Sequence, residues 1–142
     1  MEKIPSPKWF LIIVVLALIW NIIGLIAFIN YTMMSPQALS ELSLQEQNLY
    51  KNTPIWATAA FAVAVVAGTL GCVSLLMKKN NARVLFMASV LGVVIQNVYA
   101  FIIVDSISVY GVVSVIMPLM VFAIAICLLI LAFKAKANNW LN

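Results

Sequence analysis

The segment PIWATAAFAVAVVAGTLGCVSLLM, residues 54–77, contains no charged side chain and is long enough to cross a lipid bilayer as a helix. The hydrocarbon core of a bilayer is about 30 Å thick, and a helix that rises about 1.5 Å per residue needs about 20 apolar residues to span it. Residues 9–31, 84–104 and 112–133 meet the same two conditions. These four spans fill most of the 142 residues, so the sequence predicts a single transmembrane domain over residues 1–142.

The composition excludes an ordinary soluble domain. Hydrophobic residues make up 65% of the chain and charged residues only 8%, whereas soluble domains carry about 25% charged residues. A soluble fold of this length cannot bury so much apolar surface. We therefore expect the lipid bilayer to be the solvent of this chain.

The basic residues are distributed unevenly between the two sides of the predicted bundle. An even number of spans places both termini on one side. Of the eight Lys and Arg residues, only Lys51 does not fall on that side. This is the positive-inside pattern, which predicts cytoplasmic termini and places the long loop at residues 32–53 on the opposite, periplasmic side. Anionic lipid head groups, and not nucleic acid, are the expected partners of these charges. The cytoplasmic residues are Lys3, Lys8, Lys78, Lys79, Arg83, Lys134 and Lys136.

The predicted periplasmic loop carries two helix start signals. Ser35 is followed by a proline and predicts a short helix over residues 36–41. Ser43 and Glu46 form a capping-box pattern, which predicts a second short helix over residues 44–51. Short connections also follow the second and third spans, and short connections make successive helices antiparallel neighbours. The expected fold is therefore an all-α membrane protein, an antiparallel four-transmembrane-helix bundle with a short helical periplasmic loop.

Small residues recur at four-residue spacing along the second span. Close helix contact in lipid depends on small side chains and on interhelical hydrogen bonds, so we expect this stripe and the glycine of the third span to lie at helix interfaces. The stripe fits either the core of one bundle or the seam of a dimer. The predicted packing residues are Ala60, Ala64, Gly68, Gly71 and Gly92.

Two amide side chains lie inside the predicted spans. Asn21 and Gln96 fall at the same expected depth, about 20 Å along outward-running helices, and a lone amide in hydrocarbon needs a partner. Either they bond to each other or to backbone and hold the first and third spans together, or they line a pocket for a neutral ligand with Trp20 and Tyr99 as stacking neighbours. Asn97 is rotated about 100° from Gln96, so we expect it either to belong to this ligand site or to reach a different helix or a second protomer.

Groups that usually perform chemistry in membranes are missing from the spans. The sequence has no histidine, and no acid or base lies within a predicted span, which argues against ion coupling through a buried charge. The two cysteines, Cys72 and Cys127, are expected at similar depth near the cytoplasmic side, where contact between them is feasible, as reduced packing residues. We therefore expect no enzyme activity, no metal and no cofactor.

Several short motifs resemble those of a family of small bacterial four-helix inner-membrane proteins. Its members are loosely labelled sugar-transporter-like, and the resemblance covers nearly the whole chain. The resemblance implies four membrane helices and location in a bacterial inner membrane, and it raises the expectation of transport of a neutral solute. The residues that carry it are Trp20-Asn21-x-x-Gly24, Tyr50 with Thr53-Pro54-x-Trp56, Ala60-Phe61-Ala62, Gly68-x-x-Gly71, Leu75-Leu76, Gln96 and Trp140-Leu141.

Two functions remain open from the sequence. The first is a non-enzymatic binding or interaction role, in which the protein docks a membrane-protein partner or a lipid, or holds a neutral polar small molecule. The alternative is a homo-oligomeric transporter or facilitator of a small neutral solute such as a sugar, with Asn21 and Gln96 lining the path. Because four helices leave little room for a path within one protomer, this alternative requires at least a homodimer.

Overall fold

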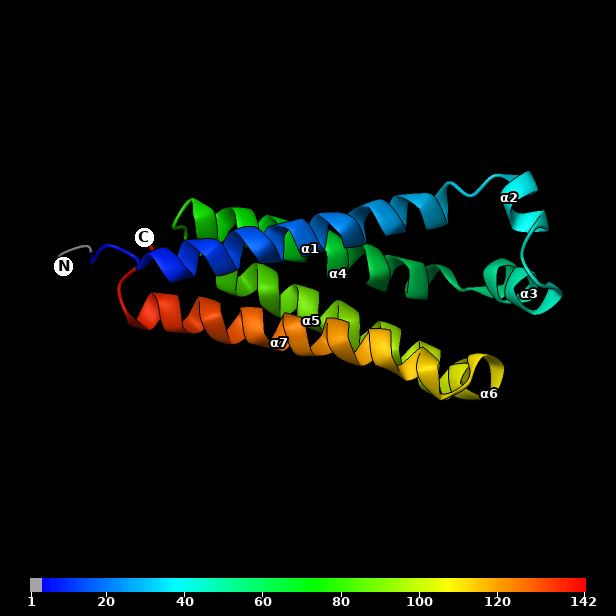
Figure 1. Cartoon of the computed structure of the whole chain (residues 1–142). Coiled ribbons are helices and arrows are strands. Elements are labelled where there is room, and N and C mark those ends of the chain that lie inside the picture. The colour runs from blue at the N-terminus through cyan, green and yellow to red at the C-terminus, as the bar shows by residue number, and fades with distance from the viewer. Residues whose placement is uncertain (1–3) are drawn as a thin grey trace.

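The computed structural model describes residues 4–142, and the described chain is all-helical (Figure 1). Lys3 of the predicted cytoplasmic tail lies outside the described residues. Four helical segments are long and apolar enough to cross a membrane, which confirms the four predicted spans. They are α1 (Lys8–Thr32), α4 (Ile55–Leu76), α5 (Ala82–Val98) continued by the π-helix η1 (Tyr99–Ile103), and the 3-10 turn η2 (Val112–Val115) followed by α7 (Ile116–Ala137).

The two predicted loop helices are confirmed as α2 (Pro36–Ser40) and α3 (Leu44–Asn52). The Ser35 hydroxyl accepts a hydrogen bond from the amide of Ala38 at 3.1 Å, as an N-cap does. The capping box of α3 is also present, because Ser43 Oγ accepts from the Glu46 amide at 3.3 Å and Glu46 Oε2 accepts from the Ser43 amide at 3.0 Å. These caps satisfy amides that each short helix leaves unpaired.

The third span departs from a continuous α-helix at its end. Its last turn, η1, is π-helical, and Asp105 then adopts a left-handed conformation with φ of 51°. The connection that follows holds the one-turn helix α6 (Ser106–Tyr110). Sequence periodicity does not distinguish such a turn from an α-helix, so the predicted straight span over residues 84–104 is too simple.

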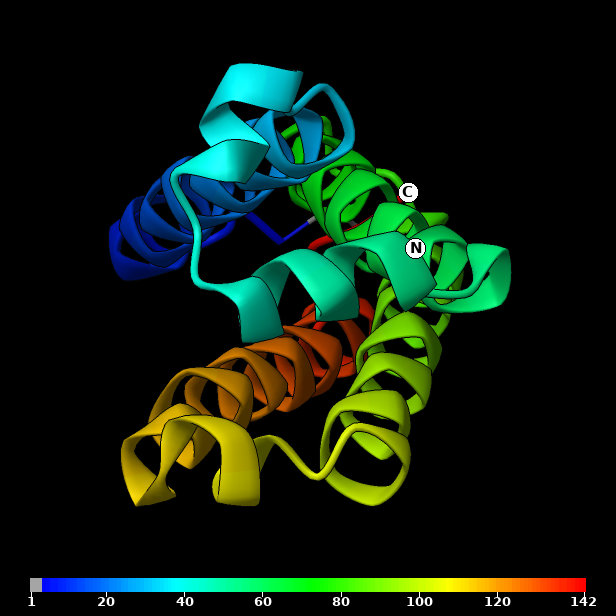
Figure 2. The ribbon, with the colours of Figure 1, turned by 90° about the vertical axis from the view of Figure 1, so that its right-hand side faces the viewer.

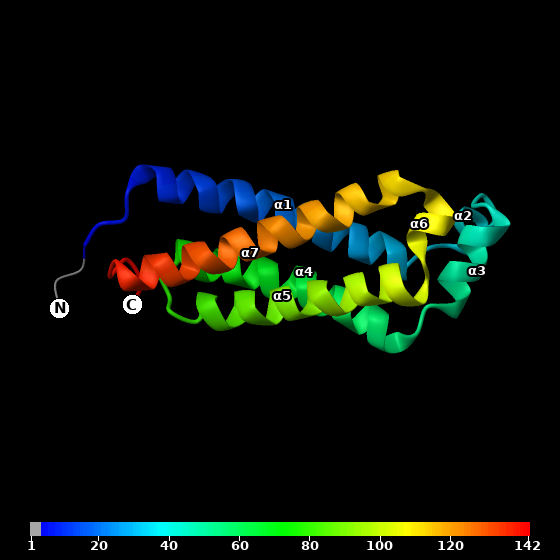
Figure 3. The same ribbon diagram turned by 90° about the horizontal axis from the view of Figure 1, so that it is seen from below.

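The long helices pack in the order α1 on α4, α4 on α5 and α5 on α7, whereas α1 and α7 do not pack closely. Viewed along the bundle, α4 and α5 lie together on one side, α1 and α7 stand apart on the other, and α3 lies across the near end (Figure 2). The splaying of α1 from α7 toward the α2 and α6 end is visible in Figure 1. The view from below shows α7 crossing in front of α1 (Figure 3).

The small residues of α4 lie inside this single chain. Ala60, Ala64, Gly68 and Gly71 are all buried. A Cβ atom at Gly92 of α5 would stand only 2.7 Å from the carbonyl oxygen of Ala60, so the two backbones meet where no side chain intervenes. Beside this contact, the Ser89 hydroxyl donates a hydrogen bond of 2.7 Å to the carbonyl of Ala64. Small residues and one buried hydroxyl therefore bring α4 and α5 together, as expected for helices in lipid.

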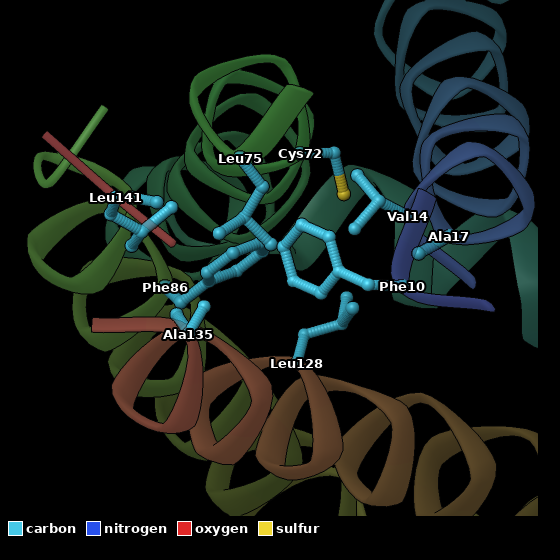
Figure 4. Packing of buried hydrophobic residues seen from close by; sticks show 11 residues of the cluster. Phe10, Val14, Ala17, Cys72, Leu75, Phe86, Leu128, Ala135 and Leu141 are labelled. Atoms are coloured by element: carbon cyan, nitrogen blue, oxygen red, sulfur yellow. The ribbon is translucent and has the colours of Figure 1, made fainter. Parts of the chain in front are cut away.

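An apolar cluster closes the end of the bundle that carries both chain termini. Phe10 of α1 is fully buried against Leu75, Phe86 and Leu128 of the other three long helices (Figure 4). The C-terminal residue Asn142 exchanges backbone hydrogen bonds with the α4–α5 connection. The start of α1, that connection and the C-terminus therefore lie at one end, and α2, α3 and α6 lie at the other (Figure 1).

Candidate functional site

A cavity of about 430 Å³ lies between the four long helices, within the range of small-molecule sites in proteins, about 300–1,000 Å³. Its wall is mostly apolar, with side chains such as Phe61, Val65 and Ile124. No Asp, Glu, Lys or Arg occurs among its lining residues, all of which fall within residues 4–142. The residues that offer polar atoms to this inner cavity, with the indole of Trp20 included, are Trp20, Asn21, Ser89, Gln96 and Asn97.

The inner cavity lies along the side where α1 and α7 fail to pack closely. Ile23 of α1 and Met117 of α7 both line it, yet their side chains are 56% and 58% exposed. Toward the termini, Leu128 lines the cavity and also belongs to the buried cluster around Phe10. The inner cavity is therefore closed at the terminal end of the bundle and bordered by exposed apolar side chains at the α1–α7 gap.

Asn21 is held by α1 and α4 and not by the third span. Its Nδ2 donates to the carbonyl of Ala17 at 2.9 Å and to Cys72 Sγ at 3.6 Å. The Asn21 carbonyl oxygen rests directly against Gly68, where a Cβ atom would collide with it. Of the two bonds predicted as alternatives, Asn21 forms the one to backbone and not the one to Gln96. Because its backbone partner belongs to α1 itself and its sulfur partner to α4, Asn21 does not hold the first and third spans together.

Gln96 and Asn97 line the inner cavity together. Asn97 therefore lies beside Gln96 at the cavity, where a residue of the predicted ligand site is expected. Both side chains are half-buried, and neither forms a hydrogen bond with another side chain or backbone group of residues 4–142. An amide offers two donors and a carbonyl acceptor, and half-buried polar groups usually find partners. These two amides are therefore available to a ligand or to water.

Tyr99 occupies a different position from the one predicted. It does not line the inner cavity beside Trp20 but packs edge-on against Trp56, with ring centroids 5.4 Å apart. Tyr99 is the first residue of the π-helical turn η1 and lines a different cavity, described next.

A second, outer cavity of about 370 Å³ lies between the ends of the long helices and helix α3. It is rich in hydroxyl groups, and the Tyr31 hydroxyl donates to Thr53 Oγ1 at 3.1 Å while Thr53 Oγ1 donates to the carbonyl of Leu49 at 2.7 Å. Sequence reasoning missed this cavity, because its residues come from five separate segments and share no motif. Its hydroxyl-bearing residues are Tyr31, Thr53, Thr58, Tyr99, Ser106 and Tyr110.

The two cysteines are separated by their orientations. Cys72 is fully buried beside Asn21, as expected of a packing residue, whereas Cys127 is exposed on α7, and both thiols are free. Equal depth in the bundle does not bring them together because their helices present them to different sides. Within residues 4–142, no group of three or more His, Cys, Asp or Glu side chains is placed to hold a metal ion.

Comparison with known protein families, with curated proteins and with solved structures finds no match to this chain. The resemblance to sugar-transporter-like membrane proteins therefore stays a prediction from the sequence. The two cavities are therefore the features of the chain from which a function can be inferred.

Proposed function

We propose that this chain is a non-enzymatic membrane protein, an antiparallel four-helix bundle of a bacterial inner membrane with cytoplasmic termini, that binds a neutral small molecule in its inner cavity. The observation that carries the proposal is the uncharged cavity of about 430 Å³, in which Gln96 and Asn97 lack partners among residues 4–142. Apolar walls with a few convergent polar groups are typical of ligand sites.

The absence of charge from the lining supports a neutral ligand. Transferring an unpaired charge into an apolar site carries a large free-energy penalty, and no ionic side chain among the lining residues could compensate it. Amides, in contrast, donate to carbonyl or ether oxygens and accept from hydroxyl groups. The site therefore suits a molecule that has hydrogen-bonding atoms and no net charge.

A matched pair of variants on α7 tests this proposal. Val121 lines the inner cavity, whereas Leu119 does not and is 53% exposed. Native mass spectrometry of the wild-type protein, taken directly from the membrane, should show a retained neutral adduct. Val121→Trp fills the cavity and should abolish the adduct, and Leu119→Trp should keep it. A wild-type protein without an adduct, or equal loss in both variants, would refute the proposal.

The proposed orientation has its own test. A periplasm-dependent reporter enzyme such as alkaline phosphatase should be inactive when fused after Asn142 and active when inserted between α2 and α3. The support is the uneven distribution of basic residues, together with contacts that bring the C-terminus to the α4–α5 connection. Activity of the C-terminal fusion would contradict cytoplasmic termini.

A homo-oligomeric facilitator of a neutral solute is the second candidate. It is favoured by the outer cavity, which adjoins the inner one and extends polar lining toward the α3 end. The buried cluster around Phe10 blocks the other end of the single chain, so transport would need either a partner copy or a second conformation. A strictly monomeric protein that gives no solute flux in liposomes would eliminate this candidate.

A further inference from the structure

The inner and outer cavities share part of their lining. Phe61, Gln96 and Ala100 belong to both, and they come from α4, α5 and η1. Gln96 is the polar member of this shared wall, and its amide forms no hydrogen bond with another side chain within residues 4–142. A molecule that occupies both cavities would therefore pass directly beside this amide.

The two cavities differ in chemistry. Beyond the shared wall, the inner cavity is mainly aliphatic and aromatic, whereas the outer cavity gathers six hydroxyl-bearing side chains. The Ser106 hydroxyl is buried, with only 8% of the residue exposed, and has no hydrogen-bond partner in the described chain. A buried hydroxyl without a partner is unfavourable, and Ser106 lines the outer cavity, so a rotation of this side chain toward the cavity would let its hydroxyl bond to an occupant.

The outer cavity is also uncharged at neutral pH. Its lining contains no Asp, Glu, Lys or Arg. Burial, and to a smaller extent the nearby Glu46 carboxylate, raise the pKa of Tyr110, so its phenol remains a hydrogen-bond donor. Asp105 precedes Ser106, but its carboxylate accepts a hydrogen bond from the exposed Ser108 and does not line the cavity. Neither a cationic nor an anionic head group would find a counter-charge there.

The direction of this polarity matches that of a lipid in a bilayer. The hydroxyl-rich cavity lies at the ends of the long helices beneath α3, and the apolar cavity lies deeper, next to the α1–α7 gap. An amphiphile with its head at the membrane interface places its chain toward the midplane. It could enter sideways from the bilayer between α1 and α7, where exposed apolar side chains border the cavity.

We infer that the outer cavity is a head-group subsite and that the ligand is an uncharged single-chain amphiphile of the acylglycerol class. The glycerol hydroxyls lie among Ser106, Thr58 and the tyrosines, the ester carbonyl accepts from Gln96, and the acyl chain fills the inner cavity. This inference rests on the proposed function and specifies its ligand.

The test measures quenching of Trp20, which lines the inner cavity. The full chain with Trp9, Trp56 and Trp140 replaced by Phe is placed in phosphatidylcholine nanodiscs. The probe is a monoacylglycerol whose chain carries two bromine atoms. We expect saturable quenching that unbrominated monooleoylglycerol reverses and added phosphatidylcholine does not. Ser106→Ala and Gln96→Leu should each weaken the apparent affinity by about tenfold, and Ser108→Ala, on the exposed side of α6, should leave it unchanged.

Three further probes separate this inference from the proposed function. Free glycerol should not compete, the brominated fatty acid should bind weakly because of its charge, and the brominated methyl ester should bind weakly because it lacks hydroxyl groups. Equal affinity for the methyl ester, or equal effects of Ser106→Ala and Ser108→Ala, would overturn the head-group subsite while leaving a neutral ligand in the inner cavity. If Ser106→Ala fails to fold, Thr58→Val replaces it with the same expected loss. If no neutral probe quenches Trp20 saturably, the proposed function is overturned as well.

Discussion

Replacing Gly92 with alanine tests the contact between α4 and α5. A Cβ atom there would lie 2.7 Å from the carbonyl oxygen of Ala60 and 2.8 Å from the amide nitrogen of Ala64. Both are backbone atoms that no side-chain rotation can move, so the helices must separate. Overpacking costs about 1–3 kcal/mol, strain on the Ser89 hydrogen bond adds about 0.6, and the helix preference of alanine offsets about 0.9. With overpacking at the middle of its range, the free energy of unfolding should fall by about 1.7 kcal/mol.

The assay is reversible unfolding in mixed micelles with increasing SDS, followed by tryptophan fluorescence. Gly24→Ala is the matched control, because its Cβ would meet only the side-chain atom Val65 Cγ1, at 3.3 Å, which can give way. Gly24→Ala gains the same helix preference of about 0.9 kcal/mol without a backbone clash, so we expect the control to be at least as stable as the wild type. A Gly92→Ala protein as stable as the Gly24→Ala protein would refute the backbone contact between α4 and α5.

Three further predictions follow from single contacts. Ser89→Ala removes the buried hydrogen bond to the Ala64 carbonyl and should lower the free energy of unfolding by about 0.6 kcal/mol and by no more than about 1.7; a larger loss in the same SDS titration would contradict this interpretation. Gly68→Ala should displace the Asn21 side chain, whose oxygen occupies the space of the new methyl group, and should weaken binding of the brominated probe; unchanged affinity would show that the Asn21 orientation does not matter. Hydrogen bonds from the Ser43 side chain and backbone lower the pKa of Glu46 from its ordinary 4.5, so their contribution to α3 is complete above that value and is lost as the pH falls through the lowered pKa. The protection factors of the α3 amides, taken relative to the intrinsic exchange rate at each pH, should therefore fall at acidic pH in the wild type, and Glu46→Gln should lose this dependence.

The number and placement of the long helices could be predicted because lipid imposes simple rules on a sequence. A span must be long, apolar and uncharged, and residues 9–31 and 54–77 are identified as spans by that criterion alone. The caps at Ser35 and Ser43 are equally local, since each depends on residues three positions apart. Features encoded within one turn or one span are therefore visible without a structure.

Contacts between spans are much less visible. Asn21 and Gln96 were matched by depth, but depth does not fix the angle at which each side chain leaves its helix. In the folded chain Asn21 turns to Ala17 and Cys72, whereas Gln96 borders both cavities. The π-helical turn at Tyr99 changes that angle again for every residue after it, and no residue pattern marks such a turn.

The outer cavity could not be predicted from the sequence for a different reason. Tyr31, Thr53 and Ser106 lie at the ends of three different segments, where hydroxyl side chains are ordinary capping or interface residues. Their convergence depends on how α3 and α6 fold back over the helix ends. Only the combination of a buried, unpartnered Ser106 with a shared Gln96 wall makes the position informative.

Whether a gap between α1 and α7 is stable depends on the solvent around the two helices. In water, exposed residues such as Ile23 and Met117 would drive the two helices together, because closing the gap would remove apolar surface from contact with solvent. In lipid that drive is absent, and helices associate only where small residues or hydrogen bonds allow close contact. The close contacts described above join α4 to α5 through Gly92 and Ser89, and α1 to α4 through Asn21. An acyl chain can therefore occupy the gap without opposing any strong helix–helix contact, and for this reason a lipid-like ligand fits the architecture better than a water-soluble one.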